Sequence, residues 1–123
     1  MSTISSVASL AASIRDAPVP AAISLVEDNG AFKFCDDEGR SIYVYDLDPA
    51  GASVCTGQCA SKWPPIAAPQ GATRIGDWTP IRRPDGTLQW AHKGRPVYTF
   101  SGDTAAGQAN GAGQGGVWRL LVP

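Results

Sequence analysis

The residues of this 123-residue chain that could do chemistry are three cysteines and a single histidine. Cys55 and Cys59 are four positions apart in a polar stretch, and in one helical turn or a tight loop their Cα atoms can come within the ~4.4–6.8 Å that a disulfide requires. The spacing predicts a Cys55–Cys59 disulfide, with a redox pair, a metal-binding pair or free thiols as alternatives. It differs from the Cys-x-x-Cys of thioredoxin-like sites, and no histidine follows Cys59 as it would in a haem attachment motif.

A metal site is the more specific alternative to the disulfide. Cys35, Cys55, Cys59 and His92 would form a Cys₃His set, a soft tetrahedral site suited to zinc. Nothing in the sequence requires Cys35 or His92 to lie near the Cys55 loop, and a single histidine at a strand end is more often a hydrogen-bonded or surface residue. We therefore expect no cofactor, with zinc or another soft metal at these four residues as the alternative.

No arrangement typical of an enzyme is visible. The acidic segment 46–51 resembles a calcium loop, but it lacks the later ligands and the closing glutamate, and Asp48 is better explained by hydrogen bonds to the turn backbone. The glycine-rich segment 107–116 lacks the Gly-Lys-Ser/Thr of a phosphate-binding loop. His92 has no assignable serine or aspartate partner, so we predict no catalytic residue and favour a non-enzymatic protein.

The elements that must position these residues occur twice. When the chain is aligned with itself at a shift of 55, residues 39–66 match residues 94–121 without a gap. The identical pairs are Gly39/Gly94, Arg40/Arg95, Tyr43/Tyr98, Asp48/Asp103, Ala50/Ala105 and Trp63/Trp118. A repeat at a fixed period predicts two similar structural units.

Each copy contains three segments typical of β-strands, because they alternate apolar and polar residues or are rich in β-branched and aromatic ones. The predicted strands are residues 23–26, 32–35 and 41–45 in the first copy and 78–83, 87–92 and 96–100 in the second. Asn29-Gly30 is a strong hairpin turn. Pro80 indicates an edge position or a bulge, since proline cannot donate to a ladder.

The sequence thus predicts a mainly β (all-β) fold of two duplicated three-stranded antiparallel meanders with long glycine-rich loops. A lone meander is marginal in water, so the two should pack as a small sandwich or partly closed barrel with pseudo-two-fold symmetry. Residues 22–123 are expected to form a single β domain, with repeats at about 22–66 and 77–121 and a linker at 67–72. Residues 1–21 would be a tail or a short helix, because Ile4, Val7, Ala11 and Ile14 fall at helical spacing.

The aromatic residues divide into two sets. Those at duplicated positions, Tyr43, Tyr98, Trp63 and Trp118, are expected to form the paired core, since they carry most of the area available for burial. Trp78 and Trp90 lack aromatic counterparts in the first copy. With His92, they are the candidates for an asymmetric ligand-binding surface.

The net charge of −1 and the sequence pI of about 5.6 disfavour nucleic acid as a partner, because nucleic-acid binders usually carry clustered basic residues. No apolar stretch approaches the ~20 residues of a transmembrane helix. The first residues lack the charged and apolar regions of a signal peptide. This is expected of a cytoplasmic protein or of a mature chain with a new start methionine.

The segment 43–65, which contains Cys-x-x-x-Cys-Ala-x-x-Trp-Pro-Pro, resembles the bacterial "secreted repeat of unknown function" family of predicted lipoproteins. The second half resembles its later part, at Trp78, residues 83–86, Gln89-Trp90, residues 93–96, residues 98–100 and residues 113–118. The resemblance spans about 40–120 and implies an exported protein, periplasmic or secreted, often attached to the cell envelope, with no established activity. We therefore expect an extracytoplasmic binding or structural module of unknown ligand, stabilised by a Cys55–Cys59 disulfide. A metal-binding or redox (electron-transfer) protein that uses Cys55 and Cys59, with Cys35 and His92, is the alternative.

Overall fold

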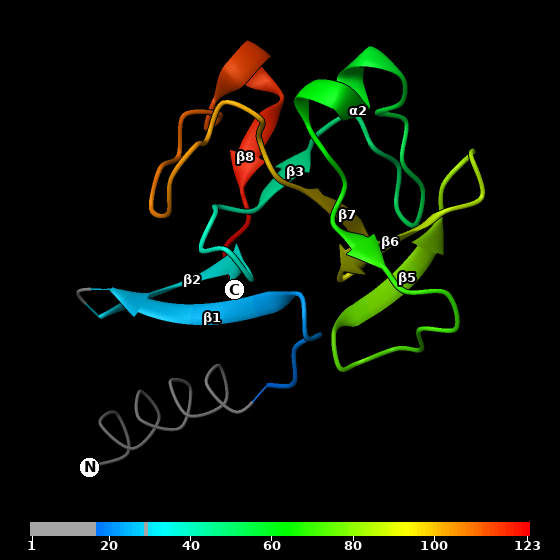
Figure 1. Cartoon of the computed structure of the whole chain (residues 1–123), viewed down its shortest axis with the longest axis horizontal. Coiled ribbons are helices and arrows are strands. Elements are labelled where there is room, and N and C mark those ends of the chain that lie inside the picture. Colours follow the sequence, from blue (N-terminus) through cyan, green and yellow to red (C-terminus); the bar gives the residue numbers. More distant parts are fainter. Residues whose placement is uncertain (1–16, 29) are drawn as a thin grey trace.

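The computed structural model describes residues 17–28 and 30–123, and most of the segment expected to be a tail or a short helix, residues 1–21, lies outside them. Nearly all of the regular structure is antiparallel β-strand, which confirms the predicted class (Figure 1). The elements in chain order are β1 (Ile23–Asp28), β2 (Ala31–Asp36), β3 (Tyr43–Tyr45), α2 (Gln58–Lys62), β4 (Ala67–Ala68), β5 (Trp78–Arg82), β6 (Leu88–His92), β7 (Arg95–Tyr98), the short 3₁₀ helix η1 (Gln114–Gly116) and β8 (Trp118–Leu120).

Strands β1 and β2 form a two-stranded sheet of their own. Their register pairs Asp28 with Ala31, so the connection has two residues, as the turn signal at 29–30 predicts. Gly30 has φ +82°, a left-handed conformation that glycine adopts without a steric penalty.

The other strands form one sheet in the order β4-β6-β7-β3-β8, with β5 paired to the other side of β6. Strands β5, β6 and β7 are the predicted meander of the second copy. Among the strands of the described residues, β5 pairs with β6 alone, which places Pro80 on an edge strand as expected. The segment predicted as a linker begins with β4, whose Ala67 and Ala68 pair with Gln89 and Leu88.

Strand β3 does not complete a meander with β2, and here the structure differs from the prediction. It pairs with β7 on one side and β8 on the other, and its connection to β2 is reduced to the bridge between Cys35 and Ser41. Tyr43 and Val44 are at most 1% exposed. A strand this apolar on both faces is stable only inside a sheet, and β7 and β8 provide that position.

Pseudo-two-fold symmetry relates the two copies, as predicted. Tyr43 and Tyr98, which are equivalent positions, pair with each other between β3 and β7, so a local two-fold axis passes between these strands. Backbone hydrogen bonds repeat about this axis in matched pairs. Ile66 N donates to Val97 O at 3.1 Å, and its equivalent Leu121 N donates to Ile42 O at 2.8 Å. Ser101 N donates to Lys62 O at 2.9 Å, and its equivalent Asp46 N donates to Val117 O at 2.8 Å.

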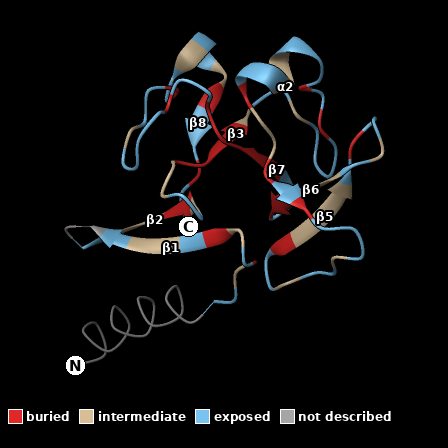
Figure 2. Cartoon of the chain, viewed as in Figure 1, coloured by how far each residue is buried: buried red, intermediate tan, exposed pale blue. Residues whose placement is uncertain are grey.

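The buried residues follow β3, β6 and β7 (Figure 2). They form two clusters. One is mainly aliphatic, with Trp78 and Trp90, and lies between the β1–β2 hairpin and the larger sheet. The other is the aromatic cluster, which surrounds the two-fold axis and includes Cys55. α2 and η1, which occupy similar positions in the two copies, both lie at the end of the molecule away from that hairpin (Figure 1).

Candidate functional site

Two tyrosine–aspartate pairs cross between the copies at the two-fold axis. The Tyr43 hydroxyl donates to Asp103 Oδ2 and the Tyr98 hydroxyl donates to Asp48 Oδ2, each at 2.6 Å. Burial, followed by the bond to the carboxylate, raises the pKa of both hydroxyls well above the usual value for tyrosine, so both remain donors. Asp48 also accepts from Val54 N at 2.7 Å, the turn-backbone bond that the sequence predicts. The bond across the copies was not predicted, although duplication of both Tyr and Asp was its signal.

The duplicated aromatic residues form the core of the aromatic cluster, as expected. The rings of Trp63 and Trp118 stack with centroids 3.8 Å apart and an angle of 6° between planes. Tyr43 meets the edge of Trp63 at 5.3 Å, and Tyr98 meets Trp118 in the same way at 5.2 Å. These four side chains are at most 5% exposed. They are structural, because nothing of their faces is left for a ligand.

Cys55 and Cys59 form a disulfide with their Cα atoms 5.2 Å apart, which confirms that prediction. Cys55 is fully buried, whereas Cys59, in α2, is only partly buried. The equivalent residues of the second copy are Asn110 and Gln114, where the Gln114 amide donates to the Asn110 carbonyl at 3.4 Å. The two copies therefore close the same loop by different means, one covalent and one by hydrogen bonding.

Arg83 is a buried cation beside the disulfide that the sequence analysis missed. It is 5% exposed, and its guanidinium donates to Ser53 Oγ at 2.9 Å, Gln89 Oε1 at 2.8 Å and Cys55 O at 2.7 Å. Ser53 Oγ lies 2.6 Å from the Tyr98 hydroxyl, which connects Arg83 to Asp48. Burial raises the pKa of the Asp48 carboxyl, while the bond from Tyr98 and the charge of Arg83 act in the opposite direction. This network fixes the loop before Cys55 from several sides.

Trp78 and His92, two of the predicted ligand-binding residues, lie inside the protein. They are 1% and 6% exposed and form an aromatic group with Phe34 of β2, with centroid distances of 4.6 to 5.2 Å. Burial, followed by the charge of Lys93, lowers the pKa of His92, and Asp77 partly opposes this shift. Both residues hold the β1–β2 hairpin against the larger sheet, and their role in ligand binding stays a prediction.

The structure does not assemble the four residues of the predicted Cys₃His set. Cys55 and Cys59 are bonded to each other, and Cys35 is a free, buried thiol on β2. Burial, and then the neighbouring Asp36, raise the pKa of Cys35, which disfavours the thiolate that a metal needs. Across residues 17–28 and 30–123, three potential ligand atoms come within 4.8 Å of one another only at Asp36, Asp37 and Glu38.

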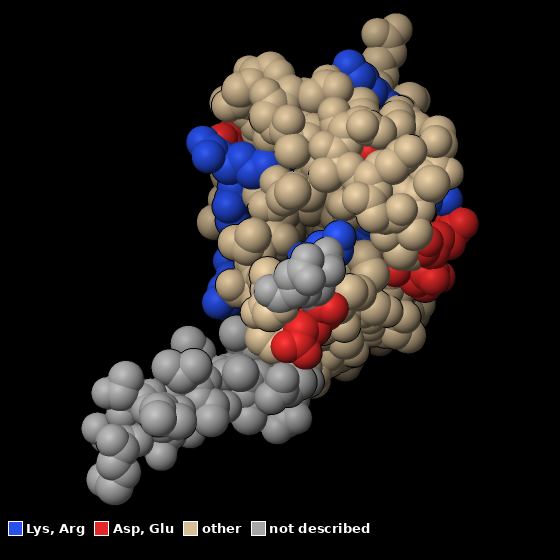
Figure 3. Space-filling model, turned by 90° about the vertical axis from the view of Figure 1, so that its left-hand side faces the viewer, with Lys and Arg blue, Asp and Glu red and all other residues tan. Residues whose placement is uncertain are grey.

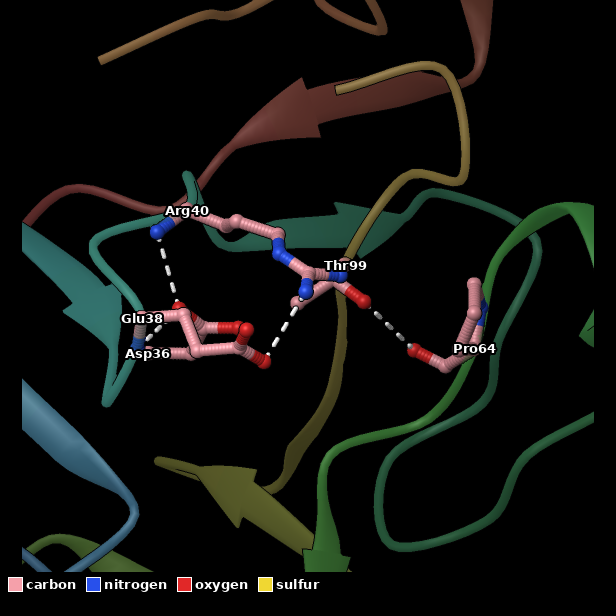
Figure 4. Close-up of polar contacts among 5 residues, drawn as sticks. All are labelled: Asp36, Glu38, Arg40, Pro64 and Thr99. Carbon is pink, nitrogen blue, oxygen red and sulfur yellow. Dashed lines mark hydrogen bonds and ion pairs between the residues drawn. The ribbon is translucent and has the colours of Figure 1, made fainter. Parts of the chain in front are cut away.

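This acidic group lies at the end of β2 and in the turn that follows, and the carboxylates of Asp36 and Glu38 have protein partners (Figure 4). Asp36 Oδ1 accepts from the backbone N–H groups of Glu38 and Arg40 at 2.9 and 2.8 Å. Glu38 Oε1 accepts from the Arg40 guanidinium at 2.8 Å. Figure 4 also shows Thr99, which follows β7, beside the Pro64 carbonyl. These contacts close a turn and join segments of the two copies, and they give Asp36 and Glu38 structural roles.

A pocket of about 330 Å³ lies where the start of β1 meets the segment between the copies. Trp90, the third predicted ligand-binding residue, forms part of its wall although it is only 3% exposed, and its role in ligand binding stays a prediction. The other residues are small or apolar apart from one threonine: Ala21, Ala22, Pro69, Ala72, Thr73 and Ile75. We call this the Trp90 pocket. None of the described residues that line it has an ionisable side chain, so the chemistry of this lining is that of an uncharged, mainly apolar surface.

Charged residues are spaced over the surface rather than gathered at this pocket. On the face drawn in Figure 3, Lys and Arg lie along the left edge and at scattered points elsewhere, and Asp and Glu lie mainly at the right edge and low in the middle. Asp46 is paired with both Arg95 and Arg119, at 3.2 and 2.7 Å. In the part of the chain that the structure describes, no helix combines the length and apolar character needed to cross a membrane.

The fold and site define a small, mainly β protein with an internal two-fold, one disulfide and an uncharged pocket. A family described as "secreted repeat of unknown function", and named for lipoproteins, matches residues 79–121. This match confirms the resemblance over β5 to β8, the second copy. Neither a curated protein nor a solved structure matches the chain.

Proposed function

We propose that the chain is a non-enzymatic extracytoplasmic binding module that takes a small uncharged ligand into the Trp90 pocket. The observation that carries the proposal is the pocket itself. Its volume of about 330 Å³ lies at the small end of the range for ligand sites. The described lining is mainly apolar, with Thr73 as its one hydroxyl residue and with Trp90 only 3% exposed at its wall, so the pocket favours a small neutral, mainly apolar compound over an ion or a sugar.

The compartment is inferred from two independent features. The matched family is described as secreted. The Cys55–Cys59 disulfide is of a kind that persists in oxidising compartments such as the periplasm or the exterior. Intact mass of protein from its natural host, alkylated with and without reductant, tests this part. Alkylation of Cys55 and Cys59 without any reductant would reject it.

The binding part is tested by NMR titration with two matched probes, neutral indole and the anion indole-3-acetate. We expect saturable shifts of the Trp90 indole N–H and of residues 69–75 with indole, and much weaker shifts with the anion. Ala72→Trp should fill the pocket and abolish the shifts. Ala52→Trp, at an exposed position outside the pocket, should leave them unchanged.

An absence of saturable shifts in the wild type, or equal shifts in Ala72→Trp, would reject the binding role and leave a structural module. Equal binding of the anion would reject the chemistry assigned to the ligand. Melting of the two variants by circular dichroism confirms that each is folded before the titrations are compared.

A further inference from the structure

We propose that Cys59 is the sulfur at which an external dithiol opens the Cys55–Cys59 disulfide, and that the chain remains folded while this bond is open. The first observation is the unequal exposure of the two sulfur-bearing residues. Cys55 is 0% exposed within the aromatic cluster, whereas Cys59 is only partly buried. A thiolate must approach the sulfur that it attacks, so the burial of Cys55 directs the attack to Cys59.

The second observation is that the loop is held without the disulfide. The Cys55 carbonyl accepts from Arg83 at 2.7 Å, and Val54 N donates to Asp48 at 2.7 Å. Ser53 Oγ is within 2.6 Å of the Tyr98 hydroxyl. These bonds fix the three residues that end at Cys55, so breaking the S–S bond releases α2 rather than the whole loop.

The second copy supports the same conclusion. Its equivalent loop reaches the same place in the fold with Asn110 and Gln114 where the first copy has its cysteines. Asn110 N donates to Asp103 at 2.8 Å, and Gly111 N donates to the Tyr43 hydroxyl at 3.2 Å. Hydrogen bonds are therefore sufficient to hold this type of loop in this fold.

The charge around Cys59 favours exchange. α2 contains no acidic residue, and Lys62 lies three positions after Cys59, which brings the two to neighbouring positions on a helix. A cation near a cysteine stabilises its thiolate, so Lys62 favours the second step of the exchange, in which Cys59 is the leaving thiolate.

The exchange is balanced with a dithiol as the reductant. One thiolate of the dithiol attacks Cys59 Sγ, the Cys55–Cys59 bond breaks, and Cys55 leaves with the electron pair and takes up a proton. The second thiol of the dithiol then attacks the mixed disulfide and releases Cys59. The dithiol is oxidised to its disulfide by two electrons, and Cys55 and Cys59 are both reduced to thiols.

The test compares Cys55→Ser with Cys59→Ser, both in a Cys35→Ala background so that each protein has a single thiol. Each is treated with glutathione disulfide, and adduct formation is followed by intact mass. In the folded state, we expect Cys59 to form its adduct at least about tenfold faster than Cys55, and in urea we expect the two rates to converge. Equal rates in the folded state, or faster reaction at Cys55, would overturn the proposal.

Two measurements on the wild type do not depend on the folding of these variants. Treatment with limiting glutathione, quenching in acid and peptide mapping should find the mixed disulfide on Cys59, and its presence mainly on Cys55 would contradict the direction of attack. After full reduction with dithiothreitol, the protein should keep a cooperative thermal transition. Loss of that transition would contradict the claim that the open form is folded.

Discussion

Tyr43→Phe and Tyr98→Phe remove the two symmetry-related hydroxyls and keep both rings in place. A hydrogen bond to a charged group contributes about 1.5–3 kcal/mol, and an orphaned buried partner adds to the loss. Tyr43→Phe leaves Asp103, which is 2% exposed, without its Oδ2 partner, and it also removes the acceptor of Gly111 N. We expect its free energy of unfolding to fall by about 3–4 kcal/mol.

Tyr98→Phe should cost less, about 1.5–2 kcal/mol. Its partner Asp48 is only half-buried, so water can replace the lost hydroxyl. Ser53, which also contacts the Tyr98 hydroxyl, keeps its bond from Arg83. The two tyrosine–aspartate hydrogen bonds are therefore related by symmetry but differ in their contribution to stability, because Asp103 is more deeply buried than Asp48.

The measurement is urea unfolding of the oxidised proteins, followed by tryptophan fluorescence and circular dichroism. Tyr45→Phe is the matched control. The Tyr45 ring stacks on Trp118 at 4.3 Å, and its hydroxyl makes no hydrogen bond with the described residues, so its removal should change the stability by less than about 0.5 kcal/mol. Equal losses for Tyr43→Phe and Tyr98→Phe, or a larger loss for Tyr98→Phe, would refute the reasoning from burial.

Three further predictions concern other buried positions. Burial lowers the pKa of His92 from 6.5, so the unfolded chain takes up this proton first as the pH falls. The free energy of unfolding should therefore decrease below pH 6.5, by at most about 1.4 kcal/mol per pH unit. The same slope in His92→Gln would contradict this reasoning. Arg83→Leu should lower the free energy of unfolding in urea by about 3–5 kcal/mol, because it leaves buried acceptors without a donor. Arg82→Leu, at the exposed neighbouring position, should lower it by less than about 0.5 kcal/mol. Similar losses for the two variants would show that Arg83 is dispensable. A Cβ at Gly111 would lie 2.5 Å from a tryptophan ring, so Gly111→Ala should lower the free energy of unfolding by about 1–3 kcal/mol through overpacking. In Gly107→Ala the new Cβ meets no atom within 4 Å, so this variant should lose only about 1–2 kcal/mol to the strain of its positive φ. A Gly111→Ala variant as stable as the wild type would contradict the close packing.

The duplication makes the differences between the copies informative. Cys55 and Cys59 form the disulfide of the first copy, and their equivalents in the second copy, Asn110 and Gln114, have no thiol. Arg83 and Trp90 lie outside the aligned segments 39–66 and 94–121. The disulfide, the buried cation and the pocket wall are therefore all found where the symmetry is broken. The residues that the copies share form the central strands and the aromatic cluster, whereas the proposed pocket and the proposed thiol exchange depend on residues that they do not share.

Local pattern was sufficient for much of the fold. Alternation of apolar residues, turn residues such as Gly30 and the repeat at a shift of 55 predicted the β1–β2 hairpin, β3, the β5–β7 meander and the Tyr43/Tyr98 symmetry, but not β4 or β8. The Cys55–Cys59 bond was also predictable, because four residues of chain hold the two sulfurs close together whatever the rest of the molecule does. In each case the information lies in short-range geometry or in the comparison of one copy with the other.

Only the tertiary structure decided which surfaces meet. β3 exchanged its expected neighbour for β7 and β8, Arg83 entered the interior although its neighbour Arg82 is exposed, and Cys35 and His92 were placed apart from the disulfide. A sequence shows that a strand face is apolar or that a side chain is charged, but not which distant segment covers it. Burial and long-range pairing depend on the packing of the whole chain, and so does the Trp90 pocket, which forms only where the start of β1 meets the segment between the copies.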